Sequence, residues 1–598
     1  MEASIFASIL HIIGFLSLFV AIFLLPKSEK KLNGVMWLLL SLLSEMCWGT
    51  FIAALINFVH IPINIYSMGI LYLCSAIALG VVIYRKKIIQ KYQWDVFDIV
   101  VSIGIIVSAF AVLYYMAGPD LKLIYINSDA AAHLRTAVYL VLDQRLPGMY
   151  FAPLHTAMVL EVLMPAVPIY EFYKIFLVMD AALLAVEIIL FFMFCREYLT
   201  NWKMKGIGVA MTLIYTLGYP FESYRWSFYY WGIGVMLVGF VVMLLRMYRT
   251  KEIPRPYVLF LLMIALHSVT MCYMLFGPPT YVAAFLCLAV IVKREGKLIT
   301  KENFLLALKV FLIPTILAVY YCYFDFLVRE GLSATEVLSR EGGIYREVYV
   351  NFLWLLPLVL YLVIHALYKR EFDENMIFFL VTAICVLVTF AFTIKLRMSG
   401  YYYYKSYYPL WFFLFALAIQ AIEKMLKDHW EVLISYGLVL AGLFALHYWG
   451  IEAMILRSQQ NLQEWDRSAE FFSIYDYNRA YYADVYETFP DSYREVCRYV
   501  VNELDGEEVP MLAVLANYQD CFWYEALTGQ DSSEYYGWDH HWAKIKKKLD
   551  NKDVKYFAIY RNCPLNAIWK DYIKQFKVVY KNESGIVYST KKKHSAAK

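Results

Sequence analysis

Residues 4–25 read SIFASILHIIGFLSLFVAIFLL, an apolar run without a single Asp, Glu, Lys or Arg. A helix of about 20 apolar residues crosses the hydrocarbon layer of a bilayer, which is about 30 Å thick. Similar runs recur at 35–57, 97–117, 175–194 and 431–449. The sequence therefore predicts a polytopic α-helical membrane protein.

The composition of the whole chain agrees with this prediction. Of its 598 residues, 61% are hydrophobic and 17% are charged, whereas soluble domains are about half apolar and a quarter charged. The net charge of +4 is too small to indicate nucleic-acid binding, and it divides into +6 over residues 1–450 and −2 over 451–598. We expect a membrane domain over 1–450 and a soluble domain over 451–598. The helix-like stretch 491–504 and the strand-like stretch 555–561 indicate that the second domain is a small α/β domain.

The membrane part divides into apolar windows that predict about fourteen spans. These windows cover 4–25, 34–57, 65–84, 97–117, 171–194, 205–219, 229–245, 257–275, 279–292, 304–324, 349–367, 376–394, 406–422 and 431–449. A further apolar piece, 153–167, is too short to cross; it contains Pro153 and Pro165 and is followed directly by Pro168. It predicts a re-entrant or interfacial helix covered by protein.

The loops between these windows predict the orientation of the chain. If the N-terminus lies outside, the inner loops carry 22 Lys and Arg and the outer loops carry 11, as the positive-inside rule requires. An even number of spans places both termini and the C-terminal domain on the extracytoplasmic side, and we expect a multi-pass plasma-membrane protein. The first apolar run follows a lone Glu2 and lacks a basic segment, so no cleavable signal is expected.

The first long outer loop contains a candidate acid–base pair. It reads INSDAAAHLRTAVYLVLDQRLPGMYFAPLHTAMV over residues 126–159, and Asn127 and Ser128 are suited to cap a helix that begins near Asp129. Asp129 and His133 then lie one turn apart, in a position to act as acid and base or to ligate a divalent ion. Alternatively, Asp129 only complements the helix dipole.

A second outer loop keeps cations on the side that the positive-inside rule disfavours. Residues 395–409 read KLRMSGYYYYKSYYP, with Lys395, Arg397 and Lys405 among six tyrosines. Such cations suit the binding of a phosphate at the bilayer surface. The alternative is an aromatic belt with snorkelling lysines.

Two other outer loops contribute candidates of lower rank. Arg340 and Arg346 flank Gly342 and Gly343 in the loop 325–348, which would either close over a site or form a solvated connector. Residues 219–231, YPFESYRWSFYYW, hold Glu222 three positions before an arginine. That spacing is typical of a surface ion pair and less often of a catalytic acid.

Several ionisable residues fall inside the predicted spans, where an unpartnered charge is unfavourable by several kcal/mol. They are Glu45, Asp180, Glu187 and His267. They would serve as a proton relay in a transporter, or as single buried groups bonded to a neighbouring helix. In the C-terminal part, Cys497, Cys521 and Cys563 form no CxxC pattern, and one disulfide among them is possible.

The segment NSDAAAHLRTA, followed by FAPLH at 151–155, resembles the acid–His–Leu motif and downstream Pro-Leu of C-type membrane glycosyltransferases, the GT-C fold. The segment GYYYYKSYYP is similar to the Tyr-Tyr-x-x-Lys stretch of some bacterial cell-envelope members of that family. Four spans precede the acid-bearing loop here, where many relatives have one. This chain also has Ser128-Asp129 where many relatives have adjacent acids.

The resemblance implies a GT-C-like fold and transfer of a sugar from a polyprenyl-phosphate donor to a cell-envelope glycan, lipid or protein acceptor, with inversion. It implies that Asp129 is the base, oriented by His133, or that both hold a Mg or Mn ion. It also implies that Lys405, Arg397, Arg346 and Arg340 hold the donor phosphate. The alternatives are a transporter or a flippase of lipid-linked glycans, and a polysaccharide polymerase or ligase.

Overall fold

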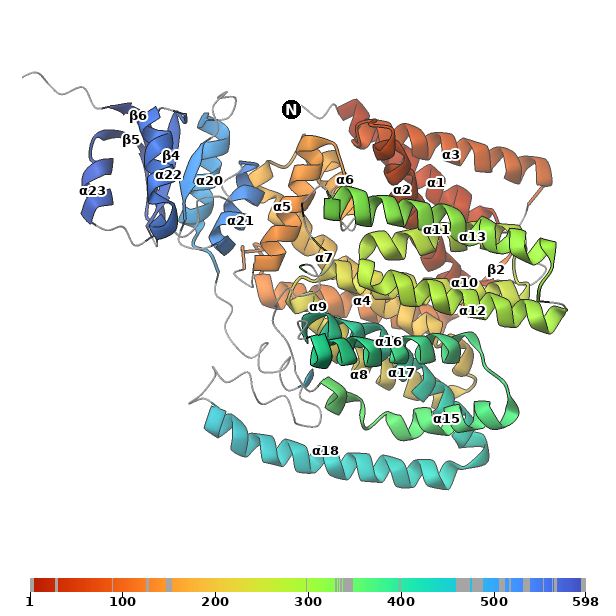
Figure 1. The fold of residues 1–598 in the computed structure, drawn as a ribbon. Coiled ribbons are helices and arrows are strands. Elements are labelled where there is room, and N and C mark those ends of the chain that lie inside the picture. The colour runs from red at the N-terminus through yellow and green to blue at the C-terminus, as the bar shows by residue number, and fades with distance from the viewer. Residues whose placement is uncertain are drawn as a thin grey trace, which may run out of the picture.

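The structure is a computed structural model that describes most of the chain (Figure 1). The described residues are 5–26, 31–88, 90–124, 128–146, 153–296, 298–328, 348–396, 400–458, 488–504, 511–515, 518–530, 538–551, 553–561 and 567–592, with the single positions 331, 333, 336, 474, 475 and 563.

Eleven helices in this part of the chain are long and apolar enough to cross a membrane. They are α1 (Ile5–Leu24), α2 (Gly34–Phe58), α3 (Ile65–Lys86), α4 (Val96–Ala117), α7 (Phe172–Phe194), α10 (Tyr229–Thr250), α11 (Arg255–Cys272), α12 (Gly277–Glu295), α13 (Lys301–Val319), α16 (Glu374–Leu396) and α17 (Gly400–Asp428). A helix satisfies all its interior backbone hydrogen bonds within itself, as the bilayer demands. The prediction of a polytopic α-helical membrane protein is confirmed.

Three predicted spans correspond to helices with shorter described apolar stretches. The window 205–219 is α8 (Trp202–Leu217, 16 residues), and 349–367 contains α15 (Leu356–Lys369, 14 residues). The third lies in α18 (Trp430–Ser458), which Figure 1 shows along the edge of the bundle that lies away from α1 and α3. The number of fourteen spans stays a prediction.

Three short helices gather at one end of the bundle, which we call the α5 face. They are α5 (Ser128–Asp143), α6 (Pro153–Leu163) and α9 (Tyr219–Arg225). Helix α6 occupies the piece predicted to be re-entrant or interfacial, and it contacts α1, α5 and α7. Its Leu154, Ala157 and Leu160 are fully buried, so protein covers this helix as expected.

The opposite end carries the loops that the sequence predicts to be basic and internal. There a two-residue parallel pairing joins β1 (Leu32–Asn33) to β2 (Tyr92–Gln93). Beside it, Arg196 pairs with Asp95 at 2.7 Å and with Asp98 at 2.6 Å. These contacts tie the start of α4 to the end of α7, because Arg196 lies two residues after the last residue of α7. Which end faces the cytoplasm stays a prediction from the charge bias.

Short turns of other helix types connect the elements. They are the 3-10 turns η1 (Ile169–Glu171), η2 (Arg196–Tyr198), η3 (Met274–Phe276) and η5 (Val348–Phe352), and the π-helical segment η4 (Tyr320–Val328).

The C-terminal part forms a small α/β region, as predicted. Its helices are α20 (Asp491–Leu504), α21 (Tyr518–Thr528), α22 (Trp538–Asn551) and α23 (Ala567–Ile573), and its strands are β3 (Leu512–Val514), β4 (Tyr556–Tyr560), β5 (Phe576–Lys581) and β6 (Gly585–Lys592). The sheet order is β3-β4-β6-β5, with β3 parallel to β4 and the other pairs antiparallel. The predicted helix at 491–504 and strand at 555–561 are confirmed as α20 and β4. The domain boundary at 450 stays a prediction.

This α/β region lies at the α5 face (Figure 1). The Phe489 backbone N–H donates to the Leu123 carbonyl at 2.9 Å, and Ile124 forms a bridge with Thr488. Arg494 of α20 donates to the Tyr173 hydroxyl of α7 at 2.8 Å. The α/β region is therefore held by contacts to the segments on both sides of α5.

All ten cysteines lie in the described part of the chain, and each is a free thiol. Cys497, Cys521 and Cys563 are buried, each in the packed interior of the α/β region. The disulfide considered from the sequence is not formed, and these cysteines act as small packing residues.

Candidate functional site

Helix α5 begins where the sequence predicts, and it places Asp129 and His133 one turn apart. Ser128 is its first residue, and Asp129 lies in the first turn. The Asp129 carboxyl group and the His133 ring are both half-buried. The His133 ring lies edge-on to Tyr230 of α10, with ring centroids 4.6 Å apart. The predicted pair therefore points towards α10 at the α5 face.

Lys405 reaches the same place from α17. Its side chain is 1% exposed, and its Nζ donates a hydrogen bond to the Tyr230 hydroxyl at 2.9 Å. Four aromatic rings surround the ammonium at 4.8–5.6 Å from their centroids, those of Phe228, Tyr230, Trp231 and Tyr273. Cation–π attraction and one hydrogen bond thus replace part of the hydration that the charge loses on burial.

Asp129 and Lys405 are close enough to act on each other electrostatically. Burial raises the pKa of the Asp129 carboxyl above its usual range, and the positive charge of Lys405 opposes that rise. Burial, with the positive charges of Lys405 and Arg135, lowers the pKa of His133 to about 3. The result is a neutral imidazole beside a carboxyl whose affinity for a proton is raised, which is the property of a general base.

A second buried acid stands next to this group. Glu222 of α9 is 1% exposed and accepts a hydrogen bond from the Tyr404 hydroxyl, which neighbours Lys405 in sequence. Burial raises the pKa of Glu222 to about 7, against the opposing effects of the Arg225 charge and the Tyr404 hydrogen bond. Arg225 is itself fully buried and lies 4.9 Å from the centre of the Trp226 ring. Glu222 is therefore not the exposed surface pair that its spacing favoured.

The ionisable residues of the predicted spans are buried but do not form one connected group. Glu187 of α7 accepts from Tyr408 and, at 3.5 Å, from Tyr215, and its charge acts on Asp180. Glu45 of α2 and His267 of α11 are buried elsewhere in the bundle, and the His267 ring lies 5.4 Å from Phe51. Within the described residues, no hydrogen bond or ion pair joins Glu45 or His267 to Glu187. Glu187 is thus a buried acid satisfied by neighbouring tyrosines.

The other predicted phosphate ligands, Arg340, Arg346 and Arg397, lie outside the described residues. Of the predicted site, the structure brings together Asp129, His133 and Lys405, with Glu222 beside them. It adds Tyr230, which lies in the aromatic segment 219–231, and Tyr273, for which the sequence offers no signal.

A divalent metal does not fit the described donor set. Asp129 and His133 are joined by no third His, Cys, Asp or Glu in the part of the chain that the structure describes. The charge next to Asp129 is the Lys405 ammonium, and Arg135 acts on His133. The Lys405 ammonium repels a divalent ion at this place and already supplies the counter-charge of Asp129.

The opposite side of α5 is fastened to the α/β region. Arg135 pairs with Glu525 of α21 at 2.8 Å, and its guanidinium stacks 4.1 Å from the centre of the Phe522 ring. The Glu525 side chain is fully buried, whereas that of Arg135 is 23% exposed. The pair therefore connects the helix that carries Asp129 to a helix of the C-terminal region.

This pair predicts an asymmetric mutational result. Arg135→Met leaves Glu525 as an uncompensated buried charge and is expected to destabilise the contact by about 3–5 kcal/mol. Glu525→Leu is expected to be milder, because Arg135 still reaches solvent and stacks on Phe522. The double variant should recover most of the loss. Thermal unfolding of the purified protein checks this.

The control is Lys574→Met, which removes an exposed pair with Asp571 at 2.7 Å and should change stability by less than about 0.5 kcal/mol. If the double variant were as unstable as the sum of the two single variants, Arg135 and Glu525 would not act as a pair.

The fold and this group of side chains define a polytopic α-helical membrane protein with an acid, an imidazole and an ammonium clustered at one end of its bundle. No protein-family model and no curated protein matches the chain. Among solved structures, the chain is similar to an oligosaccharyltransferase from Archaeoglobus fulgidus in complex with Zn and sulfate, with a TM-score of 0.44 and 11% identity over 82% of this chain and 73% of that one.

A second similar structure is the archaeal oligosaccharyltransferase AglB from Archaeoglobus fulgidus in complex with an inhibitory peptide and a dolichol-phosphate. Its TM-score is 0.39, with 10% identity over 78% of this chain and 70% of that one. Both similar structures are oligosaccharyltransferases. The likeness is one of fold, and it carries no argument about activity.

Proposed function

We propose that the chain is a membrane glycosyltransferase that transfers a sugar from a polyprenyl-phosphate donor to a cell-envelope glycan, lipid or protein acceptor. One observation carries the proposal: the Asp129 carboxyl and the Lys405 ammonium act on each other in an aromatic, water-poor group at the α5 face. A base and a cation in one site suit a reaction that removes a proton from one reactant and leaves negative charge on the other.

In the proposed reaction, Asp129 acts as the base and the lipid phosphate is the leaving group. The Asp129 carboxylate takes the proton of the acceptor hydroxyl as its oxygen attacks the anomeric carbon, while the bond from that carbon to the phosphate oxygen breaks. Attack from the face opposite the phosphate inverts the anomeric centre. The departing lipid phosphate carries the negative charge that the bond pair leaves behind.

Lys405 would stabilise that charge from inside the protein. Its ammonium is buried beneath four rings and bonded to the Tyr230 hydroxyl, so its field acts through a medium of low dielectric constant and is weakly screened. His133 is neutral and edge-on to Tyr230, which suits it to orient Asp129 without competing for the proton. Arg340, Arg346 and Arg397 remain proposed ligands of the donor phosphate.

The site would lie on the extracytoplasmic side of the membrane. With the α5 face outside the plasma membrane, nucleotide sugars are absent and a lipid-linked sugar is the available donor. Both termini would then be extracytoplasmic, and the α/β region at the α5 face would contact the acceptor.

A reconstitution separates transfer from transport. Proteoliposomes with the purified chain and radiolabelled polyprenyl-phosphate sugars are expected to release free polyprenyl phosphate and to form a labelled product with envelope acceptors. Product size distinguishes addition of one sugar from block transfer by a polymerase or ligase. If no lipid-linked donor were consumed, and solute flux instead depended on Asp180, Glu187, Glu45 and His267, the chain would be a transporter.

A further inference from the structure

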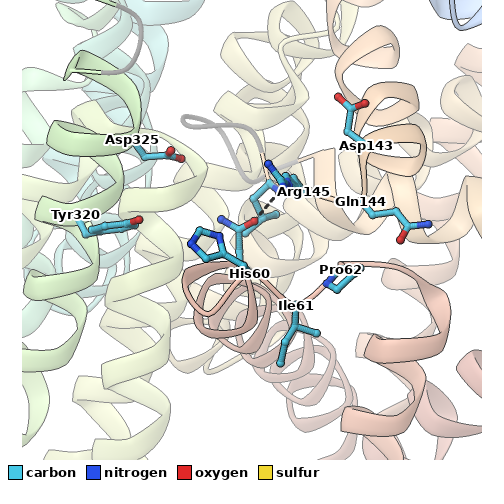
Figure 2. A pocket seen from close by; sticks show the side chains of 10 residues that line it. His60, Ile61, Pro62, Asp143, Gln144, Arg145, Tyr320 and Asp325 are labelled. Carbon is cyan, nitrogen blue, oxygen red and sulfur yellow. Dashed lines mark hydrogen bonds between the residues drawn. The ribbon is translucent and has the colours of Figure 1, made fainter.

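A polar cavity opens at the α5 face where the C-terminal ends of α2 and α5 meet η4 (Figure 2). Its volume is about 260 Å³. Figure 2 shows His60 beyond the end of α2, Asp143 and Gln144 at the end of α5, and Tyr320 and Asp325 of η4 around it, with Arg145 among them. The cavity is separate from the group around Lys405, whose residues do not line it.

The backbone is unusual on all three sides of this cavity. His60 has φ 60° and Gln144 has φ 54°, although neither is a glycine. The third side is the nine-residue π-helix of η4, which carries both Tyr320 and Asp325. Left-handed non-glycine residues and π-helical turns are uncommon and concentrate at functional sites. Glycine would adopt φ near 60° without strain. These two positions carry an imidazole and an amide side chain, which glycine would not supply.

A second cavity continues the first along the flank of α5. Its volume is about 530 Å³, and it shares Asp143, Arg145 and Leu146 with the first. It is lined further by Thr136 and Tyr139 of α5. Together the two cavities fall in the range of roughly 300–1,000 Å³ that is usual for ligand pockets. From Asp143 to Asp129 the helix rises about 1.5 Å per residue, or roughly 20 Å in all.

The lining selects an uncharged ligand with many hydroxyl groups. The carboxylates of Asp143 and Asp325 accept hydrogen bonds, and the Arg145 guanidinium donates them. Arg135, which also lines the second cavity, is paired with Glu525, so the remaining charges of Asp143, Asp325 and Arg145 give no excess of positive charge to favour a phosphate. His60 and Tyr320 at the first cavity and Tyr139 at the second add ring faces for an apolar surface. Sugar units present this combination of hydroxyls and apolar ring faces.

We propose that these two cavities form a binding site for a neutral oligosaccharide of two or more units, distinct from the group around Asp129 and Lys405. One unit occupies the cavity beside His60 and Asp325, and the next lies against Arg145 and the flank of α5. The binding itself does not depend on the proposed function. The role we assign to it does rest on that function: the site holds the remote end of a glycan whose reacting end lies at the start of α5.

The experiment measures binding by purified full-length protein in nanodiscs on a glycan array of neutral and acidic oligosaccharides, followed by titration calorimetry with the neutral oligosaccharide bound best. We expect neutral oligosaccharides to bind and the corresponding monosaccharide to bind more weakly. His60→Gly removes the imidazole and relieves the left-handed backbone, so the fold is kept while affinity falls about tenfold, the loss of one good contact. Arg145→Ala should show a similar loss.

The matched control is Lys87→Gly. Lys87 is an exposed residue with φ 48° at the end of α3, so the same backbone relief occurs away from the cavity and affinity should not change. Asp129→Asn should keep glycan affinity within twofold while losing transfer. Wild-type binding no stronger than that of His60→Gly, an equal loss in Lys87→Gly, or loss of binding in Asp129→Asn would each overturn the site. Transfer that persists in Asp129→Asn would instead remove the proposed function and leave the binding site standing.

Discussion

Asp129→Asn is expected to lower the rate of sugar transfer by about 10²–10⁴-fold, the usual contribution of a positioned general base. The side chain keeps its shape and its place in the first turn of α5 but no longer accepts a proton. The loss should appear in kcat rather than in KM, because the carboxylate acts on the hydroxyl proton as the new bond forms. A radiolabelled transfer assay in proteoliposomes measures it.

The fold should tolerate this change. Burial raises the pKa of Asp129, so the folded protein favours the neutral carboxyl, which an amide resembles. The stability that Asp129 contributes is fully present when the pH is below its pKa in the unfolded chain. It is lost as the pH rises through its pKa in the folded protein. Unfolding temperature at neutral pH should therefore be equal or higher in Asp129→Asn. The control is Asp120→Asn, an exposed acid after α4, which should leave transfer unchanged.

The same pKa shift predicts the acidic limb of the pH profile. Transfer should fall as the pH drops through the raised pKa of Asp129, which lies above the usual range of an aspartate. His133 does not produce this limb, because its pKa is lowered to about 3. Protonation of Asp129 at acidic pH thus lowers the transfer rate, although it stabilises the folded protein. Full activity of Asp129→Asn, or a limb that moves only in His133 variants, would transfer the role of base to another residue.

Lys405→Met is expected to lower transfer by about 10²–10³-fold, comparable to removal of one group that stabilises charge in a transition state. The unbranched methionine fits beneath the same rings of Phe228, Trp231 and Tyr273 but carries no charge. Lys405→Ala, which also removes the side-chain bulk, should chiefly weaken donor use. Donor-saturation kinetics in proteoliposomes check both variants.

A second effect distinguishes Lys405 from a residue of an aromatic belt. Its charge opposes the rise that burial causes in the pKa of Asp129, so Lys405→Met should move the acidic limb to higher pH. The losses in Lys405→Met and Asp129→Asn should also be less than additive, since both act on one site. Lys424→Met, in the same helix near its other end, is the control. Unchanged donor dependence and an unmoved limb would reassign the 395–409 loop to the aromatic belt.

Local sequence patterns predict part of the site around Asp129, and helix packing supplies the rest. Capping residues before an amphipathic run predicted the start of α5 at Ser128-Asp129, and helix spacing predicted that Asp129 and His133 share a face. For Glu222, by contrast, the spacing to Arg225 in the sequence favours a surface ion pair over a catalytic acid. The structure buries both residues and bonds Glu222 to Tyr404, a contact from α17 that no local pattern records.

A polytopic helical membrane protein with a small α/β region is predictable from the amino-acid sequence, because apolar run length and strand or helix periodicity are local properties of neighbouring residues. Three contacts between distant segments are visible only in the packed fold: Asp129, Lys405 and Tyr230 share one group, Arg135 is paired with Glu525, and His60, Arg145 and Asp325 surround one cavity. Each of these contacts depends on which helices pack together and on how far each helix is shifted along the axis of its neighbour. Those choices are made by the summed contacts of whole helix faces, which no single stretch of sequence contains.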